Sequence, residues 1–168
     1  MNKVIFLFSL LLISSLALTD KEIMQQALNG AFAQNNLPAP TTIVPCFDDA
    51  TAHKTVVFVG QLLQKAAAGS PTDIINAIQM TKDFIDTIPQ PVKDCLDGNQ
   101  EALALAAKYG IDDKTNFTEL EKKVATYVTL HYLTVHKWLG DLNDEWKAGK
   151  YNQFGQDAAK DAHQILGS

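Results

Sequence analysis

The chain has 168 residues and is acidic, with 14 basic and 19 acidic residues and a formal net charge of −5 at pH 7. All of the basic residues are lysines. An acidic chain without arginine argues against a nucleic-acid-binding protein and against adhesion to anionic lipid headgroups, because both partners require a basic surface. The hydrophobic fraction of 46% and the charged fraction of 20% are typical of a globular protein, and the length suits one domain.

The first residues have the composition of a secretory signal peptide. Lys3 precedes an apolar run over residues 4–18, and Ser15 and Ala17 satisfy the small-x-small rule for signal peptidase. We therefore predict a signal peptide, 1–17, and a single secreted domain, 18–168. A retained membrane anchor is the alternative, but about 15 apolar residues fall short of the roughly 20 that span a bilayer. We expect no stable membrane insertion after cleavage, and a location outside the cell or in the lumen of the secretory pathway.

The N-terminal half of the predicted domain reads as three helices separated by prolines. Asp20 is placed to cap a first helix, and the prolines of the 37–46 connector forbid a regular helix after it. The second helix, about 48–68, carries apolar residues at spacings of three and four. Ser70 and the proline that follows it favour the start of a third helix, which must end before Pro89.

The next segments read as two short helices, one carrying Cys95 and one capped by Asn99, and a long helix over 118–147. Apolar residues fill one broad arc of this long helix, while Leu130 and Leu133 point away from that arc. A helix that is apolar on more than one side needs neighbours on several faces. We therefore expect it to be the central helix of the fold.

A last helix, about 150–166, carries Gly155 and Ala159, which are small enough to let another helix approach closely. No segment has the pattern of a strand, since the β-branched 56–60 segment lies inside a helical pattern. The prediction is an all-α, single-domain bundle of five to six helices around the central helix, with one disulfide.

The two cysteines of a secreted chain predict one disulfide, Cys46 to Cys95. The alternative pairs the thiol of Cys46 with His53 as nucleophile and base. That alternative requires a free thiol outside the cell.

Asn116, Phe117 and Thr118 form an N-glycosylation sequon, so Asn116 is a candidate glycosylation site. A three-residue pattern also occurs by chance. Thr118 is in addition a candidate N-cap for the central helix, with Glu121 completing a capping box.

Five residues are candidates for a ligand pocket or a contact patch. His131 lies within the apolar arc, where it either faces a cavity or is a core histidine with a hydrogen-bond partner. Trp138, Trp146, Tyr151 and Phe154 gather around the end of the central helix and the following turn. They either close the end of the bundle as core or line a pocket or an exposed patch.

No metal or cofactor is expected. His131 and His136 are five residues apart, so they cannot form the i, i+4 pair of a helical zinc site. The acidic run 141–145 begins like a calcium loop, but Trp146 stands where the loop needs glycine and Asn152 where it needs glutamate. No catalytic or phosphate-binding motif occurs either.

The spacing of Trp146, Gly149, Tyr151 and Gly155 forms a Trp-x-x-Gly-x-Tyr-x-x-x-Gly pattern. With this pattern and its single cysteine before the second helix, the region from Cys46 to Leu166 resembles small secreted helical proteins of ciliated protists. The resemblance implies a secreted helical fold. It adds no activity and no site residue, since no activity is assigned to those proteins.

We therefore expect a secreted, non-enzymatic helical protein that acts through an extracellular protein partner, self-association or a structural assembly. The alternative function is a carrier that holds a small apolar ligand inside the bundle, with His131, Trp138 and Trp146 as part of its wall. The third hypothesis is an enzyme whose site has no linear motif.

Overall fold

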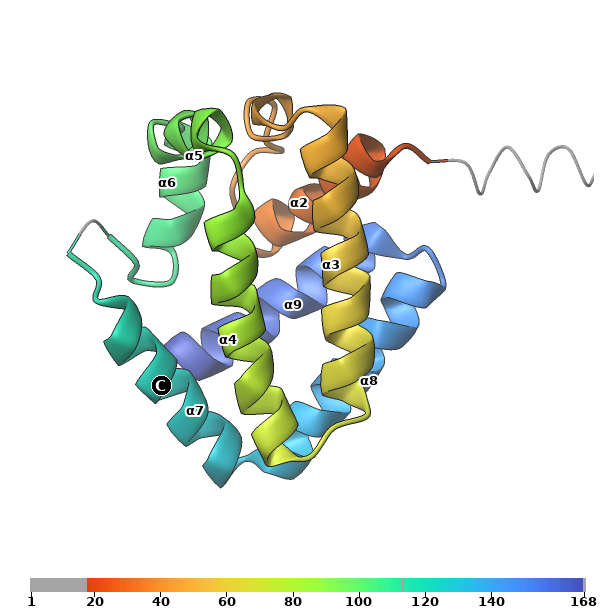
Figure 1. Ribbon diagram of the computed structural model, residues 1–168, viewed down its shortest axis with the longest axis vertical. Coiled ribbons are helices and arrows are strands. Elements are labelled where there is room, and N and C mark those ends of the chain that lie inside the picture. Colours follow the sequence, from red (N-terminus) through yellow and green to blue (C-terminus); the bar gives the residue numbers. More distant parts are fainter. Residues whose placement is uncertain (1–17, 113, 168) are drawn as a thin grey trace, which may run out of the picture.

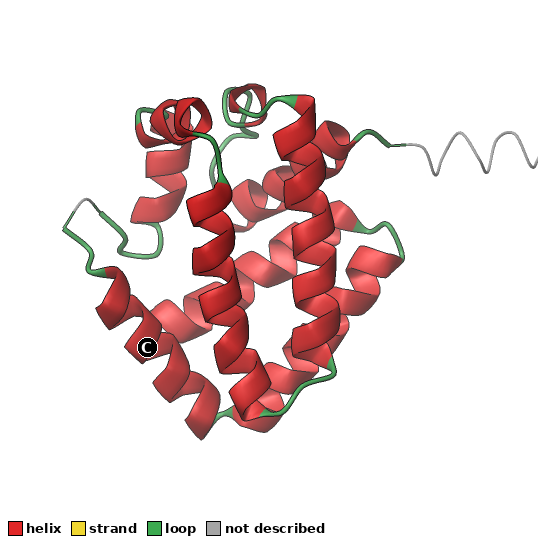
Figure 2. Ribbon diagram, viewed as in Figure 1, coloured by secondary structure: helices red, strands yellow, loops and turns green. Residues whose placement is uncertain are grey.

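The computed structural model describes residues 18–112 and 114–167, so the predicted signal peptide, 1–17, lies outside the described residues. The described chain is helical without any strand (Figure 2), which confirms the all-α class. It contains eight α-helices rather than five to six. With the labels of Figure 1, the helices are α2 (Asp20–Gln34), α3 (Asp49–Ala67), α4 (Pro71–Thr87), α5 (Gln90–Asp97), α6 (Gln100–Ala107), α7 (Phe117–Leu130), α8 (Tyr132–Lys147) and α9 (Tyr151–Leu166). A 3₁₀ turn, η1 (Val44–Cys46), precedes α3.

Two layers of helices build the fold. In Figure 1, α3 and α4 run side by side at the front and α9 passes behind both of them. α7 packs on α4 and α9, whereas α8 packs on α3 and α9. α2 lies against α9 and α3, and the short helices α5 and α6 cover one end. α9 therefore packs against three helices, α2, α7 and α8.

The helix starts are fixed by local hydrogen bonds, as the capping residues predict. The predicted caps Ser70 and Asn99 each accept a hydrogen bond from a backbone N–H in the first turn of the helix, and Asp48 does the same at the start of α3. The first helix differs, because Thr19 rather than Asp20 is its N-cap. The hydroxyl of Thr19 accepts from the N–H of Glu22, whose carboxylate accepts from the N–H of Thr19. The prediction was wrong there by one residue.

The predicted central helix, 118–147, is in fact two helices. It breaks at His131, whose φ of −122° and ψ of 31° lie outside the helical region. No proline or glycine causes the break. β-branched residues around it lower the helix propensity, and the two halves pack on different partners, α7 on α4 and α8 on α3. The prediction of one long central helix was therefore wrong.

The break produces an exposed apolar corner. Leu130 and Leu133 are 72% and 82% exposed, and we call residues 130–133 the α7–α8 corner. Both side chains point away from the buried arc, as their positions predict, but no described helix covers them.

The closest helix crossing joins α2 and α9. A Cβ atom added to Gly30 would lie 1.9 Å from the carbonyl oxygen of Asn152, and one added to Gly155 would lie 1.9 Å from that of Ala27. The two backbones therefore touch directly at these glycines. Gly155 and the buried Ala159 were predicted to admit another helix, and the structure confirms it.

The start of α7 is capped by Asn116, not by Thr118. The Oδ1 atom of Asn116 accepts a hydrogen bond of 2.9 Å from the backbone N–H of Thr118. The predicted capping box on Thr118 was therefore wrong, because the helix begins two residues earlier.

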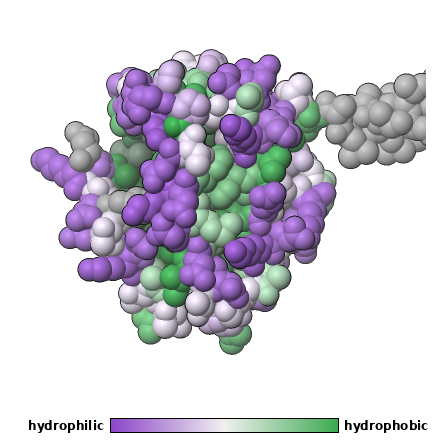
Figure 3. All heavy atoms as spheres, in the orientation of Figure 1, coloured by the Kyte–Doolittle hydropathy of each residue, from purple (hydrophilic) through white to green (hydrophobic). Residues whose placement is uncertain are grey.

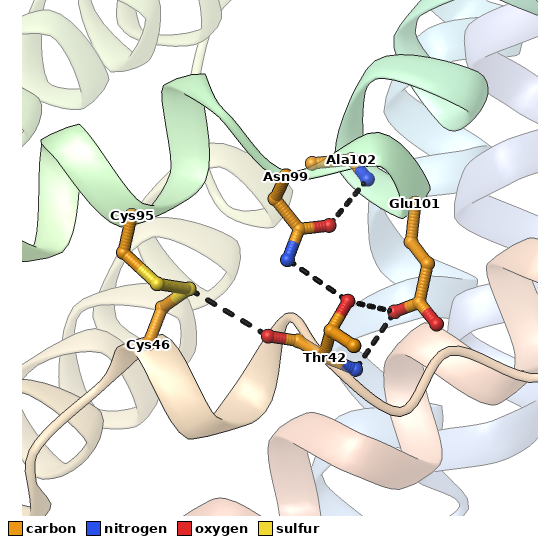
Figure 4. The surroundings of a disulfide bond; sticks show 6 residues. All are labelled: Thr42, Cys46, Cys95, Asn99, Glu101 and Ala102. Carbon is orange, nitrogen blue, oxygen red and sulfur yellow. Dashed lines mark hydrogen bonds between the residues drawn. A yellow bond between two sulfur atoms is a disulfide. The ribbon is translucent and has the colours of Figure 1, made fainter.

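Cys46 and Cys95 form the predicted disulfide, with their Sγ atoms 2.03 Å apart, and it joins η1 to α5. The free thiol that the nucleophile alternative needs is thus absent. Figure 4 shows that the connector before η1 is also held by α6, since Glu101 accepts from the backbone N–H and hydroxyl of Thr42 at 2.8 and 2.7 Å. The side-chain amide of Asn99 donates to the same hydroxyl. These bonds hold the pKa of Glu101 down, to about 2.

Candidate functional site

The five predicted pocket residues do not lie together. His131 is exposed at the α7–α8 corner, with its ring 4.4 Å from that of Tyr127. It is about 22 Å along α8 from Trp146, at a rise of 1.5 Å per residue. The expectation that His131 lies in the apolar interior was wrong, because the break in the helix turns the residue outward.

Trp138 is half-buried and lies on α8, five residues after the end of the α7–α8 corner. Its ring stacks at 6.2 Å on that of Tyr127, from α7. It also lines a polar groove between α8 and α9. Trp138 is therefore separate from the other predicted aromatic residues.

The remaining three aromatic residues do form a cluster at the turn between α8 and α9. The ring of Trp146 meets the rings of Tyr151 and Phe154 edge to face, at 5.1 and 5.0 Å. Gly149 allows the tight turn with its φ of +71°. A Cβ atom on Gly60 would lie 3.0 Å from the indole nitrogen of Trp146, so this glycine of α3 makes room for the indole.

Beneath this cluster lies an apolar pocket of about 250 Å³ that is partly open to the surface, and we call it the Trp146 cavity. Helices α2, α3, α8 and α9 and the segment around η1 surround it. It is lined by Met24, Ala27, Leu28, Ile43, Phe47, Thr55, Val56, Val59, Trp146 and Phe154. Nine of these ten side chains carry hydrocarbon or aromatic surface, and the hydroxyl of Thr55 donates to the carbonyl of Thr51 on its own helix. The cavity therefore offers a ligand apolar contacts rather than hydrogen bonds.

A second apolar pocket, of about 200 Å³ and likewise partly open to the surface, lies toward the C-terminal end of α3, among α3, α4, α7, α8 and α9. We call it the Ile78 cavity. It is lined by Leu62, Leu63, Ala66, Ile74, Ala77, Ile78, Thr81, Val124, Val128, Val135, Leu139 and Ile165. The hydroxyl of Thr81 is likewise turned away, toward the carbonyl of Ala77. Figure 3 shows an apolar hollow between the polar outer faces of α3 and α4, the two helices that bound this cavity at the front.

The groove between α8 and α9 has the opposite character. Its volume is about 440 Å³, and we call it the acidic groove. The groove is lined by five carboxylates and two lysines: Asp141, Asp144, Glu145, Asp157, Asp161, Lys137 and Lys160. Trp138, Leu142 and Gln164 complete the lining. The sequence analysis considered the 141–145 run only as a calcium loop, so it missed that carboxylates of α8 and α9 line one groove.

Glu145 has the most perturbed environment in the acidic groove. Its Oε2 atom is buried and has no hydrogen-bond partner among the described residues. Burial, and then the hydrogen bond and negative charge of Asp157, raise the pKa of Glu145 to about 7. Burial and the charge of Asp157 also raise the pKa of Asp161, to about 6. Protonation of Glu145 therefore relieves both its burial and its repulsion by Asp157.

In the part of the chain that the structure describes, no three histidine, cysteine, aspartate or glutamate side chains converge in the way that a metal ion needs. The other histidines have ordinary partners. His163 bonds Asn35 at 2.7 Å and packs against the ring of Tyr109, while His53 contacts Asp20 at 3.0 Å. Because Asn35 is buried near the end of α2, the contact with His163 fastens α2 to α9.

Comparisons with known proteins give no relative: no family model matches the chain, and neither a curated protein nor a solved structure is significantly similar. The resemblance to secreted proteins of ciliated protists therefore stays a prediction. Among the described helices, none is long and apolar enough to cross a bilayer.

Proposed function

We propose that the protein carries a small apolar ligand in the Trp146 cavity. The observation that supports this proposal is the lining of the cavity, in which even the single hydroxyl, that of Thr55, is bonded to its own helix. An enclosed apolar cavity of about 150 Å³ stays dry and accepts benzene. The Trp146 cavity is partly open to the surface but offers the same kind of apolar lining. Scaled to about 250 Å³, the ligand has about ten carbon atoms.

The aromatic side chains favour a neutral, partly unsaturated or aromatic molecule. Trp146 and Phe154 present an edge-to-face pair to one side of the cavity, which can pack against a ring or a branched hydrocarbon. Met24 on α2 adds an unbranched and polarisable side chain that adapts to ligand shape. A charged group would lose its hydration without gaining a partner, so we expect ligands with a charge inside the cavity to be rejected.

The disulfide fits a carrier that works outside the cell, because disulfides persist in oxidising compartments. The defined lining of the Trp146 cavity supports a carrier ahead of the interaction protein that the sequence analysis placed first. Catalysis without a linear motif stays a hypothesis that no described feature favours.

The second candidate function is the protein–protein interaction that the sequence analysis placed first. The observation that favours it is the α7–α8 corner, where Leu130 and Leu133 are 72% and 82% exposed. Exposed apolar side chains that form a patch mark contacts with other proteins. The corner is remote from the Trp146 cavity, so both functions are compatible.

Naphthalene is a suitable probe for the carrier proposal, because it is neutral and has ten carbon atoms. The chain has two tryptophans, so its ¹H–¹⁵N NMR spectrum contains two indole signals, and the Trp138→Phe variant identifies that of Trp146. We expect naphthalene to shift the Trp146 signal saturably. A Val59→Phe substitution, which fills the Trp146 cavity, should abolish the shift.

The matched control is Ile78→Phe, which fills the other cavity by the same kind of substitution. It should leave the response of Trp146 to naphthalene intact. The carrier proposal is wrong if naphthalene causes no saturable shift in the wild type, or if both variants bind it as the wild type does.

A further inference from the structure

We propose that the paired carboxyl groups of Glu145 and Asp157 form a pH-sensitive latch between α8 and α9, which keeps the Trp146 cavity in its binding shape in acid and loosens it at neutral pH. This inference rests on the proposed function, since it concerns how the same cavity is controlled. It predicts a carrier that takes up its ligand in a mildly acidic medium and releases it when the pH rises.

The position of the pair connects it to the cavity. Glu145 directly precedes Trp146 on α8, and Asp157 lies three residues, close to one helical turn, after Phe154 on α9. Trp146 and Phe154 both line the cavity, and their ring centroids are 5.0 Å apart. A separation of the two carboxyl groups therefore moves apart the helix segments that carry this wall.

The surroundings leave the pair without a compensating cation of its own. Every residue that lines the acidic groove belongs to α8 or α9, so α2, α3 and α7, which pack on these helices, contribute no charge to it. From α8 come Lys137, Asp141 and Asp144, and from α9 come Lys160 and Asp161.

The cations near the groove are largely engaged with other groups. Lys137 is paired with Asp141 four residues away on the same helix. Lys160 acts on Asp161, lowering its pKa. Lys150, in the turn before α9, has a favourable effect on Glu145 that is smaller than each of the unfavourable ones. Ionisation of both Glu145 and Asp157 thus places two negative charges together in a partly desolvated site.

The direction of the pH effect follows from the raised pKa of Glu145. A carboxyl with a pKa of 4.5 in the unfolded chain and about 7 in the folded protein binds its proton more tightly when folded. The stabilising effect of the shared proton is therefore complete below pH 4.5 and is lost as the pH rises through about 7. Asp161, with its pKa raised to about 6, changes in the same direction. Acid closes the latch, and neutral pH opens it.

The test compares the wild type with Glu145→Gln, because glutamine keeps the size and can still donate a hydrogen bond to Asp157 at every pH. Asp97→Asn is the matched control, since it removes one exposed carboxylate at the end of α5, outside the acidic groove. The Trp146 indole NMR signal reports on the cavity wall without ligand, and naphthalene binding at pH 5 and pH 8 reports on affinity.

For the wild type and for Asp97→Asn we expect the Trp146 signal to titrate between pH 5 and pH 8 and naphthalene affinity to fall at least about fivefold over that range. In Glu145→Gln the titration of Asp161 remains, so we expect the signal and the affinity to change with pH, but clearly less than in the wild type. Equal pH responses of the wild type and Glu145→Gln would overturn the latch.

The outcomes separate the latch from the carrier function. Naphthalene binding of equal strength at pH 5 and pH 8 would overturn the latch and leave the carrier proposal standing. If naphthalene fails to bind at any pH while the Trp146 signal still titrates through Glu145, the carrier proposal fails and the latch is supported as a conformational device.

Discussion

The contact of α2 with α9 at Gly30 and Gly155 leads to the sharpest prediction about stability. We predict that Gly155→Ala destabilises the protein, although alanine favours a helix by about 0.5–1 kcal/mol over glycine. The added Cβ atom would lie 1.9 Å from the carbonyl oxygen of Ala27, whereas ordinary contacts begin at 3.4 Å. The Cβ atom would thus be about 1.5 Å (3.4 − 1.9) too close to the carbonyl oxygen. Because that oxygen belongs to the backbone, no rotamer change can relieve the clash.

The helices must therefore separate where they pack most tightly. Overpacking of a core typically costs about 1–3 kcal/mol, and an obstacle formed by backbone belongs at the upper end of that range. After the helix-propensity gain is subtracted, we expect a net loss of about 2 kcal/mol in the free energy of unfolding. For a chain of this size that corresponds to a fall in Tm of about 4–8 °C.

The matched control is Gly140→Ala, in the middle of α8. A Cβ atom added there meets nothing within 4 Å, so this substitution should gain about 0.5–1 kcal/mol and raise Tm by a few degrees. Thermal and urea unfolding, followed by far-ultraviolet circular dichroism, measures both variants. A Gly155→Ala protein as stable as Gly140→Ala would refute the close contact of α2 and α9.

Three further predictions concern the connector, the disulfide and the sequon. Glu101→Gln should weaken the attachment of the connector and lower the stability at neutral pH. Because the pKa of Glu101 is lowered to about 2, the difference in the free energy of unfolding from the wild type, measured with urea, should shrink as the pH falls from 4.5 to 2. A difference that stays constant with pH would contradict this. Replacing Cys46 and Cys95 by serine opens a loop with a separation of 49 residues. On the chain-entropy description, this should lower the free energy of unfolding by up to about 4 kcal/mol. An unchanged free energy of unfolding would contradict a stabilising disulfide. If Asn116 is glycosylated, Thr118→Ala should remove the glycan mass while keeping the Asn116 cap; a mass unchanged by enzymatic deglycosylation of wild-type protein from a glycosylating host would refute the modification.

Features decided by local chemistry could be predicted from the sequence. The start of α4 follows from Ser70, the proline after it and Asp73, since these groups bond to one another within a single turn. The disulfide follows from there being only two cysteines in a chain with a predicted signal peptide. Gly155 was recognised as a contact point because a small residue on a helix face has few other uses.

Features decided by packing could not be predicted in this way. The apolar pattern runs without interruption through His131, so the pattern does not reveal the break, where α7 and α8 turn to different packing partners. The prediction for His131 failed for the same reason. Gly155 did not reveal that Gly30 on α2 is its partner, since nothing in the spacing of residues says which helices cross.

The acidic pair was missed although a signal existed. Glu145 and Asp157 flank a short turn between two helices, and antiparallel neighbours bring such positions together. The Trp146 cavity could not have been predicted, because a cavity exists where side chains fail to fill space. The sequence indicated its aromatic wall, Trp146 and Phe154, but not the apolar lining that α2 and α3 supply.

The most direct test of the carrier proposal is to identify what the native protein holds. We would collect the wild type and Val59→Phe from the medium of cells that secrete them, extract each with organic solvent, and compare the extracts by mass spectrometry. The proposal predicts a neutral apolar compound of about ten carbon atoms, present with the wild type in near one-to-one amount and depleted from Val59→Phe. Indistinguishable extracts from the two proteins would contradict it.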